Sequence, residues 1–250
     1  MILSRRSLGL AALSGALAPA AFAQQAAPAA GPAAGMAADD RAGYLLVMGT
    51  SLKQDVMTEY GKMLPPIYDK YKGYYVAVGG VGRGVTVLEG KFDSKSVLLA
   101  RFPAPDAVNE FWWSPEYRAA AKLRIDAEAG KFTVLRLKGR PGEGARAMGK
   151  PAYLIGIEQV KDPVKLREYG AKAGPLVGAH GGKIVAGGGR KDIELLEGSF
   201  GNLQSTVVRF ESLDALRKFY NDPAYQDAIK LRQAAADSLV LEIDGTEFKG

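Results

Sequence analysis

The chain has 250 residues, a formal charge of +6, no cysteine and a single histidine. Thiolate nucleophiles, cysteine-ligated metals and iron–sulfur clusters are therefore excluded, as is a metal site built from several histidines of one chain. Its 33 basic residues are interspersed with 27 acidic ones rather than gathered in blocks, which does not favour a nucleic-acid partner. From these features we expect no metal and no cofactor.

Residues 1–23 are typical of a signal peptide. Arg5 and Arg6 precede a short run of small apolar residues that ends in the cleavage pattern AFA. The stretch SRRSLGL resembles a twin-arginine (Tat) signal, but Leu8 stands where Phe is common, so the general secretory (Sec) route stays open. The apolar run is too short for a spanning helix. We expect a bacterial protein, periplasmic or secreted, without stable membrane insertion after cleavage.

A tandem repeat follows residues 24–42, whose Ala, Pro and Gly content predicts a disordered linker. WSPEYRAAAKLR returns 108 residues later as NDPAYQDAIKLR, and GYLLVMG returns 109 residues later as AYLIGIE. Chance does not hold such a register through a whole domain, so the two halves are duplicated copies. The sequence predicts a first repeat over 43–139, a flexible linker over 140–151 and a second repeat over 152–247.

Each repeat has the same expected order of elements. In the first repeat, strands are predicted at 44–50, 73–80, 85–90, 96–102 and 132–139, and helices at 53–71 and 104–128. Glycine-rich GGVGRG and GGGR are followed by strand-like sequence, which favours hairpin turns over phosphate loops. The order is the ferredoxin-like plan, whose bare sheet face needs cover. We predict an α+β fold, two βαββαβ repeats packed sheet to sheet as a pseudo-dimeric α/β barrel.

The repeated Pro-x-Tyr segments supply most of the candidate ligand-binding residues. Ser114 is an expected N-cap, so the long helical stretch should break there and restart at the proline. In both repeats the Tyr and Arg of this segment lie seven residues apart and share the helix face that should meet the sheet. The alternative is structural, with each Arg binding helix C-terminal carbonyls. The ligand-binding candidates are Arg124, Tyr117, Arg232, Tyr225, Tyr169 and Trp113.

Two residues are candidates for catalysis. His180 titrates near neutral pH, and its alternative role is to end a helix before two glycines. Glu197 and its counterpart Glu89 stand in matched LEG segments, where each could be a buried base or the partner of an arginine. Trp113 could stack a planar ligand, although core packing is the alternative for it and Trp112.

The second repeat resembles a known family. YLIGIEQVKDPVKLREYGAKAGPLVGAHGGKIVAGGG, ELLEG and STVVRFESLDALRKFYNDPAYQDAIKLRQAAADS are similar to domain of unknown function family 1330, in the dimeric α/β-barrel superfamily. The first repeat is a diverged copy, in which Tyr71 replaces His180. The resemblance implies the barrel fold and supplies no reaction, since the superfamily includes oxygenases, haem-degrading enzymes, isomerases and binding proteins.

Three hypotheses about function follow. The first is an exported protein that binds an unidentified small molecule in a cavity of each repeat, with the arginines pairing its anionic group. The second is a cofactor-independent monooxygenase- or isomerase-like enzyme with His180 as acid/base. The third is a structural or assembly role without a ligand. In all three the chain is an intramolecular pseudo-dimer, and a further homodimer stays open.

Overall fold

The structure is a computed structural model that describes residues 41–143, 147–201 and 203–247. The predicted signal peptide and nearly all of the predicted disordered linker lie outside these residues. The first repeat contains β1 (Gly43–Ser51), α1 (Gln54–Lys70), β2 (Tyr74–Val81), β3 (Gly84–Glu89), β4 (Ser96–Phe102), α2 (Pro105–Trp113), α3 (Pro115–Asp126) and β5 (Gly130–Lys138). The second contains β6 (Ala152–Val160), α4 (Pro163–Ala179), β7 (Lys183–Gly188), a short 3-10 turn η1 (Arg190–Asp192), β8 (Ile193–Glu197), β9 (Gln204–Phe210), α5 (Leu213–Tyr220), α6 (Pro223–Ala235) and β10 (Ala236–Asp244).

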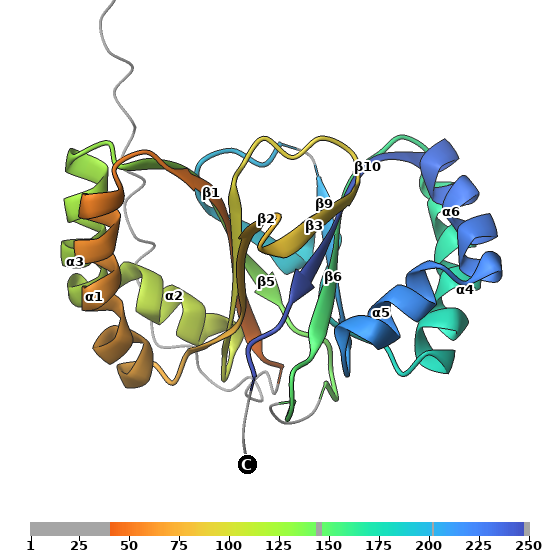
Figure 1. Ribbon diagram of the computed structural model, residues 1–250, viewed down its shortest axis with the longest axis horizontal. Helices are drawn as coiled ribbons and strands as arrows, with labels where there is room; N and C mark the ends of the chain where they lie inside the picture. Colours follow the sequence, from red (N-terminus) through yellow and green to blue (C-terminus); the bar gives the residue numbers. More distant parts are fainter. Residues whose placement is uncertain (1–40, 144–146, 202, 248–250) are drawn as a thin grey trace, which may run out of the picture. The chain divides into compact units, whose positions relative to one another are not determined.

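The strands of both repeats join in one sheet at the centre of the fold (Figure 1). Its order in the described part of the chain is β7-β9-β6-β10-β3-β2-β4-β1-β5-β8. An isolated bridge between Gly139 and Ala186 brings the two ends of the sheet together, so it is nearly closed. The predicted pseudo-dimeric α/β barrel is therefore confirmed.

One feature goes beyond the expected plan, because β3 and β8 each pair with the other repeat. β3 continues directly from β2, yet pairs with β10 over four register positions and with β2 over only two. In the same way β8 pairs with β5 of the first repeat. The hairpins predicted at the two glycine-rich segments are thus wrong, since the second strand of each leaves its own repeat. The exchange joins the two sheets into one.

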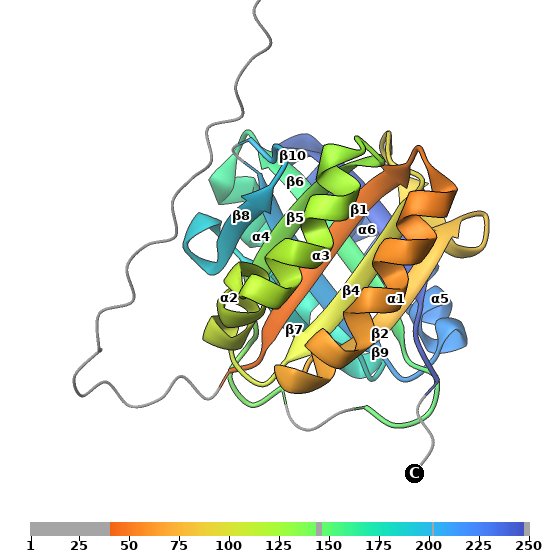
Figure 2. The same cartoon turned by 90° about the vertical axis from the view of Figure 1, so that its left-hand side faces the viewer.

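Helices cover the outer faces of the barrel. Figure 2 shows α1, α2 and α3 in front of the strands of the first repeat, and α4, α5 and α6 cover the second repeat on the opposite side of Figure 1. The predicted helix break is present: the Ser114 hydroxyl accepts a hydrogen bond from the Tyr117 amide at 3.1 Å, and Pro115 begins α3. No helix in the described part is long and apolar enough to cross a membrane.

The barrel interior is filled by apolar side chains from both repeats. Tyr44, Leu46 and Leu99 of the first repeat share this core with Ile155 and Leu241 of the second, and each is at most 1% exposed. Two further apolar clusters lie between the sheet and the helices, one in each repeat. With its interior packed, the barrel leaves the layers between sheet and helices as the places to look for a site.

Candidate functional site

Each repeat has a buried arginine held by a glutamate of the other repeat. Arg124, 5% exposed on α3, donates from both terminal nitrogens to Glu197 at 2.7 and 2.6 Å. Glu197 ends β8, the strand that the second repeat contributes to the first. This bidentate pair satisfies the charges of both groups, which is the geometry that a guanidinium and a carboxylate favour. The predicted ligand-binding residue Arg124 and the predicted catalytic residue Glu197 are thus each other's partners.

The equivalent arginine of the second repeat is held less completely. Arg232, 1% exposed on α6, donates only through Nη2 to Glu89 of β3, at 2.5 Å. Glu89 also accepts hydrogen bonds from the Tyr220 hydroxyl at 2.7 Å and from Gln233 at 3.2 Å. Burial alone would raise the pKa of Glu89, but the Tyr220 bond and the Arg232 charge hold it below its usual value. Among the described residues, Nε and Nη1 of Arg232 find no hydrogen-bond partner.

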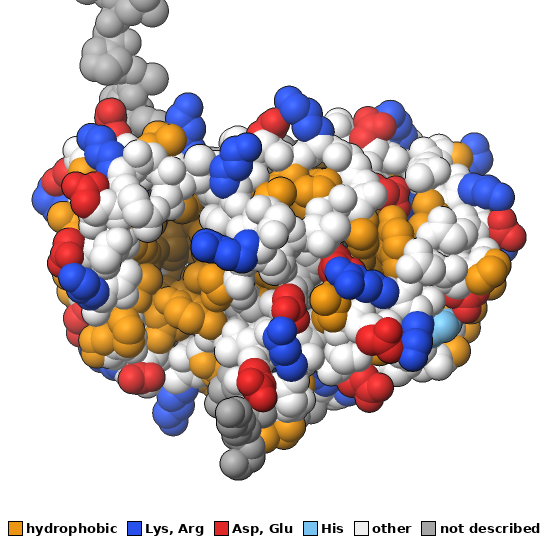
Figure 3. All heavy atoms as spheres, viewed as in Figure 1, with side chains coloured by type: hydrophobic (Ala, Val, Ile, Leu, Met, Phe, Trp, Pro, Cys, Tyr) orange, Lys and Arg blue, Asp and Glu red, His pale blue; other side chains and the backbone are white. Residues whose placement is uncertain are grey.

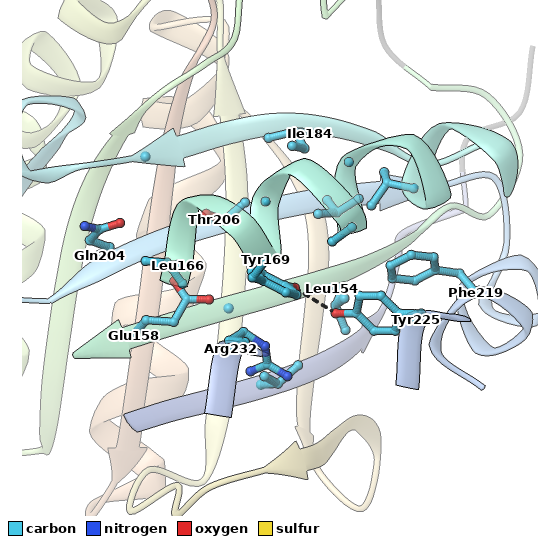
Figure 4. Close-up of a pocket in the computed structure, with 18 of the residues that line it drawn as sticks. Leu154, Glu158, Leu166, Tyr169, Ile184, Gln204, Thr206, Phe219, Tyr225 and Arg232 are labelled. Carbon is cyan, nitrogen blue, oxygen red and sulfur yellow. Dashed lines mark hydrogen bonds between the residues drawn. The ribbon is translucent and has the colours of Figure 1, made fainter. Parts of the chain in front are cut away.

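Arg232 lines a cavity of about 360 Å³ between α4, α6 and the sheet of the second repeat (Figure 4). Its walls are apolar on several sides, at Leu154, Val177 and Phe219 among others. Two tyrosines also line it, and their hydroxyls bond to each other at 3.0 Å (Tyr169 and Tyr225). Burial raises the pKa of both tyrosines, so they stay neutral near pH 7. The guanidinium of Arg232 lies 5.6 Å from the centre of the Tyr169 ring.

The first repeat carries larger and less polar side chains at the equivalent positions. Figure 3 shows hydrophobic side chains gathered in a hollow on the side of the first repeat. Rings of Tyr68 and Tyr75 meet there with centres 4.7 Å apart. The equivalent pairs, first repeat before second, are Val47 and Gly156, Gly49 and Glu158, Leu64 and Ala173, Tyr68 and Val177, Tyr75 and Ile184, and Leu98 and Thr206. The second repeat therefore has the polar cavity.

Glu158 of β6 is the cavity residue that sequence reasoning missed. Its side chain is 8% exposed, and burial raises the pKa of its carboxyl group, while the Arg232 charge acts in the opposite direction. Its Oε1 lies 2.8 Å from the point where a Cβ on Gly156 would stand, so the glycine makes room for the carboxyl group. A signal was present in the sequence, since the aligned segments GYLLVMG and AYLIGIE put Gly49 opposite Glu158.

The other predicted site residues lie outside this cavity. His180 follows the last residue of α4, and its Nε2 lies 2.8 Å from Asp222 Oδ2, where it joins α4 to the N-terminus of α6. It is not among the residues that line the cavity. In the first repeat, Tyr117 is buried and its hydroxyl lies 3.1 Å from that of Tyr60, while Trp113 is half-buried beneath Arg118. Three predicted ligand-binding residues, Arg232, Tyr225 and Tyr169, are thus brought together in one cavity.

The arrangement defines the class of protein. Two ferredoxin-like repeats that close one barrel and carry their helices outside are a dimeric α/β barrel contained in a single chain. The chain belongs to the family described as Domain of unknown function (DUF1330), whose model matches residues 42–137 and 151–246. Both repeats are thus members of the family, including the diverged first copy. No curated protein matches the chain.

Solved structures share the fold at low sequence identity. An anthrone oxidase-like protein is 13% identical, covering 84% of this chain and 92% of its own, with a TM-score of 0.50. A protein of unknown function from Rhodopseudomonas palustris is 24% identical over 39% of this chain and 82% of its own, with a TM-score of 0.32. A chlorite dismutase variant from Candidatus Nitrospira defluvii is 10% identical over 82% and 90%, with a TM-score of 0.45. At these identities the likenesses concern the fold alone.

Proposed function

We propose that the protein binds a small molecule in the cavity of its second repeat, with an anionic oxygen of the ligand against Arg232 and an apolar body along the walls. The observation that carries this proposal is the pair of unpartnered donors, Nε and Nη1, on a guanidinium that is 1% exposed. A buried donor without a partner is costly, so such a group marks a place where a ligand completes the hydrogen bonding.

The first repeat supports the proposal by contrast. Arg124 occupies the same helix position, but its two terminal nitrogens are both engaged by Glu197. Its surroundings include Tyr60 and Phe132, whose ring centres lie 5.4 and 5.0 Å from the guanidinium. One repeat thus carries a paired arginine among aromatic rings, and the other carries a partly unpaired one at a cavity. We assign binding to the second repeat only.

The test is a titration of the full chain with 3-phenylpropionate, an anion with an apolar body, beside native mass spectrometry of the protein as purified. Arg232→Gln should weaken binding about tenfold or more, because a hydrogen bond to a charged group is lost. Arg124→Gln is the matched control and should leave the affinity within a factor of about two. Equal affinities in all three proteins, or no binding to any, contradict the proposal.

The enzyme hypothesis with His180 as acid/base makes a different prediction. Because the imidazole is bonded to Asp222 and does not line the cavity, His180→Ala should leave 3-phenylpropionate binding unchanged. Reaction chemistry at that histidine would need a substrate to reach the junction of α4 and α6. Binding that depends on His180 would favour the enzyme hypothesis over the one proposed.

Export is part of the same proposal and rests on residues 1–23 alone. The twin arginines, the short apolar run and the AFA pattern support translocation followed by cleavage. The intact mass of the protein from a bacterial periplasmic fraction tests it, because cleavage after residue 23 removes a defined mass. A protein that keeps these residues and stays in the cytoplasm contradicts it.

A further inference from the structure

Glu158 is the charged group of the cavity that the proposed binding role does not use. It lies on β6, is 8% exposed and has no hydrogen-bond partner among the described residues. A carboxylate in such a setting is costly to the fold unless another group compensates it. Buried, unpaired carboxyl groups in cavities are typical of residues that give and take protons.

The first repeat shows that the fold itself does not need this carboxyl group. Gly49 stands at the equivalent position of β1, and the ring of Phe132 lies where its side chain would be, 2.1 Å from the position of an added Cβ. The second repeat instead pairs Glu158 with Gly156, whose missing side chain leaves the space that Oε1 occupies. An apolar layer in one copy is thus replaced by a buried acid in the other.

Glu158 and Arg232 line the same cavity and lie next to Tyr169 (Figure 4). A base beside a fixed cation is the combination that enolisation requires, since the base takes a proton from carbon while the cation stabilises the negative charge that appears on oxygen. The apolar walls at Leu154, Val177 and Phe219 fit an apolar substituent. Together these groups match a compound with an acidic C–H, a carbonyl oxygen and an apolar body.

We propose that the second-repeat cavity catalyses proton transfer at the carbon next to the ketone of 2-oxo acids that carry an apolar group, with Glu158 as the base and Arg232 holding the developing enolate oxygen. The inference rests on the binding function proposed above and names the substrate class and reaction of that site. Because the reaction moves only a proton, it needs no oxidant or reductant.

The step balances within the site. The Glu158 carboxylate takes the proton, the C–H bond pair forms the carbon–carbon double bond, and the carbonyl pair moves to oxygen beside Arg232. Return of the proton to carbon restores the ketone, and protonation of the oxygen gives the enol. Burial raises the pKa of Glu158, which brings its basicity closer to that of a group working near neutral pH.

The test follows the C3 hydrogens of phenylpyruvate by proton NMR in deuterated water with the full-length chain. The wild-type protein should speed their exchange above the buffer rate, and the rate should rise with pH as Glu158 ionises. Glu158→Gln should slow the catalysed exchange about a hundredfold or more and abolish this pH dependence. Its affinity for 3-phenylpropionate, which has no ketone, should stay within a few-fold of the wild type.

Gly156→Ala is the second variant, because the added methyl group occupies the place of Oε1 and displaces the carboxyl group without removing it. It should lower exchange as well. Glu242→Gln is the control, since Glu242 is a buried carboxylate of β10 that bonds Arg217 and does not line this cavity. It should exchange like the wild type.

The outcomes separate the two proposals. Binding of both compounds without exchange, or exchange that is unchanged in Glu158→Gln and Gly156→Ala, overturns the proton-transfer proposal and leaves the binding function standing. Absence of binding to either compound overturns both. Exchange lost in Glu158→Gln with 3-phenylpropionate binding retained supports both.

Discussion

Glu89 and Glu197 each stand before a glycine, and the glycine explains why the LEG segment occurs in both repeats. Gly90 and Gly198 have φ values of +80° and +82°, a region that other residues rarely adopt. A Cβ at Gly198 would lie 2.3 Å from the Phe132 carbonyl oxygen of the neighbouring strand. The glycine lets the exchanged strand approach closely, and the preceding glutamate then reaches the arginine of the other repeat.

Gly198→Ala should therefore destabilise the protein by more than backbone strain alone. A non-glycine residue in the left-handed region costs roughly 1–2 kcal/mol, and the contact with the carbonyl group adds to that cost. Gly201→Ala is the matched control, because Gly201 has a φ of +62° but its Cβ would meet nothing within 4 Å. Urea unfolding of both variants measures the difference. Equal losses of unfolding free energy would show that the close approach carries no cost.

Sequence reasoning could predict some of the candidate site residues and not others. The helix face carrying Tyr225 and Arg232 follows from their spacing, and the structure puts both at the cavity. Glu158 was missed because a glutamate near the end of an apolar strand is usually solvated, and nothing local distinguishes it. His180 attracted attention as the only imidazole, yet its ring lies at a helix junction because the glycines after it end α4.

At the level of elements, the junction of α4 and α6 depends on one polar contact. Asp222 caps α6 by accepting a hydrogen bond from the Ala224 amide at 2.7 Å, and its other carboxyl oxygen faces His180 at 2.8 Å. The bond to His180 and those to backbone amides hold the pKa of Asp222 below its ordinary value of 3.8. Both helices line the cavity, so this contact fixes two of its walls.

Asp222→Asn should lower stability in a pH-dependent way. A carboxyl group whose pKa is lower in the folded state stabilises the protein above its ordinary pKa, and this stabilisation disappears as the pH falls through the lowered value. The variant, which keeps a capping side chain, should thus be less stable near pH 7 and should approach the wild type in acid. Urea midpoints between about pH 2 and pH 7 measure this. A constant difference across that range would contradict the assignment.

The elements themselves were largely predictable from local chemistry, and their pairing was not. Ser114 and Pro115 mark the break between α2 and α3 through capping and fixed φ, which act within a few residues. The partner of β3 depends on the whole fold, because an alternating strand buries the same face in either sheet. Duplication was visible in the sequence, whereas the exchange of strands between the copies was not.

Across the whole barrel, the exchanged strands hold the repeats together more firmly than the linker does. β3 pairs with β10 and β8 with β5, and each exchanged strand ends in a glutamate that bonds an arginine of the other repeat. The linker adds a buried contact, since Glu143 accepts hydrogen bonds from the Tyr44 hydroxyl at 2.8 Å and from Arg101 at 2.6 Å.

A chain cut in the linker should therefore stay assembled. A protease site introduced after Glu143 and cleaved in the folded protein should leave two pieces that elute together and unfold in one transition, because the core between the sheets belongs to both. Size-exclusion chromatography and thermal unfolding of cut and uncut protein measure this. Two separate species at micromolar concentration would show that the repeats are independent domains.

Fusion of the two copies has a consequence for how the site can change. In a dimer of identical subunits every mutation falls on both halves, so a buried acid beside one cavity must also be tolerated beside the other. In a single chain, Glu158 can arise opposite Gly49, and one half can keep its aromatic packing and lend Glu89 to its neighbour. The first copy is then free to specialise as a support, and selection for a new ligand acts on one pocket at a time.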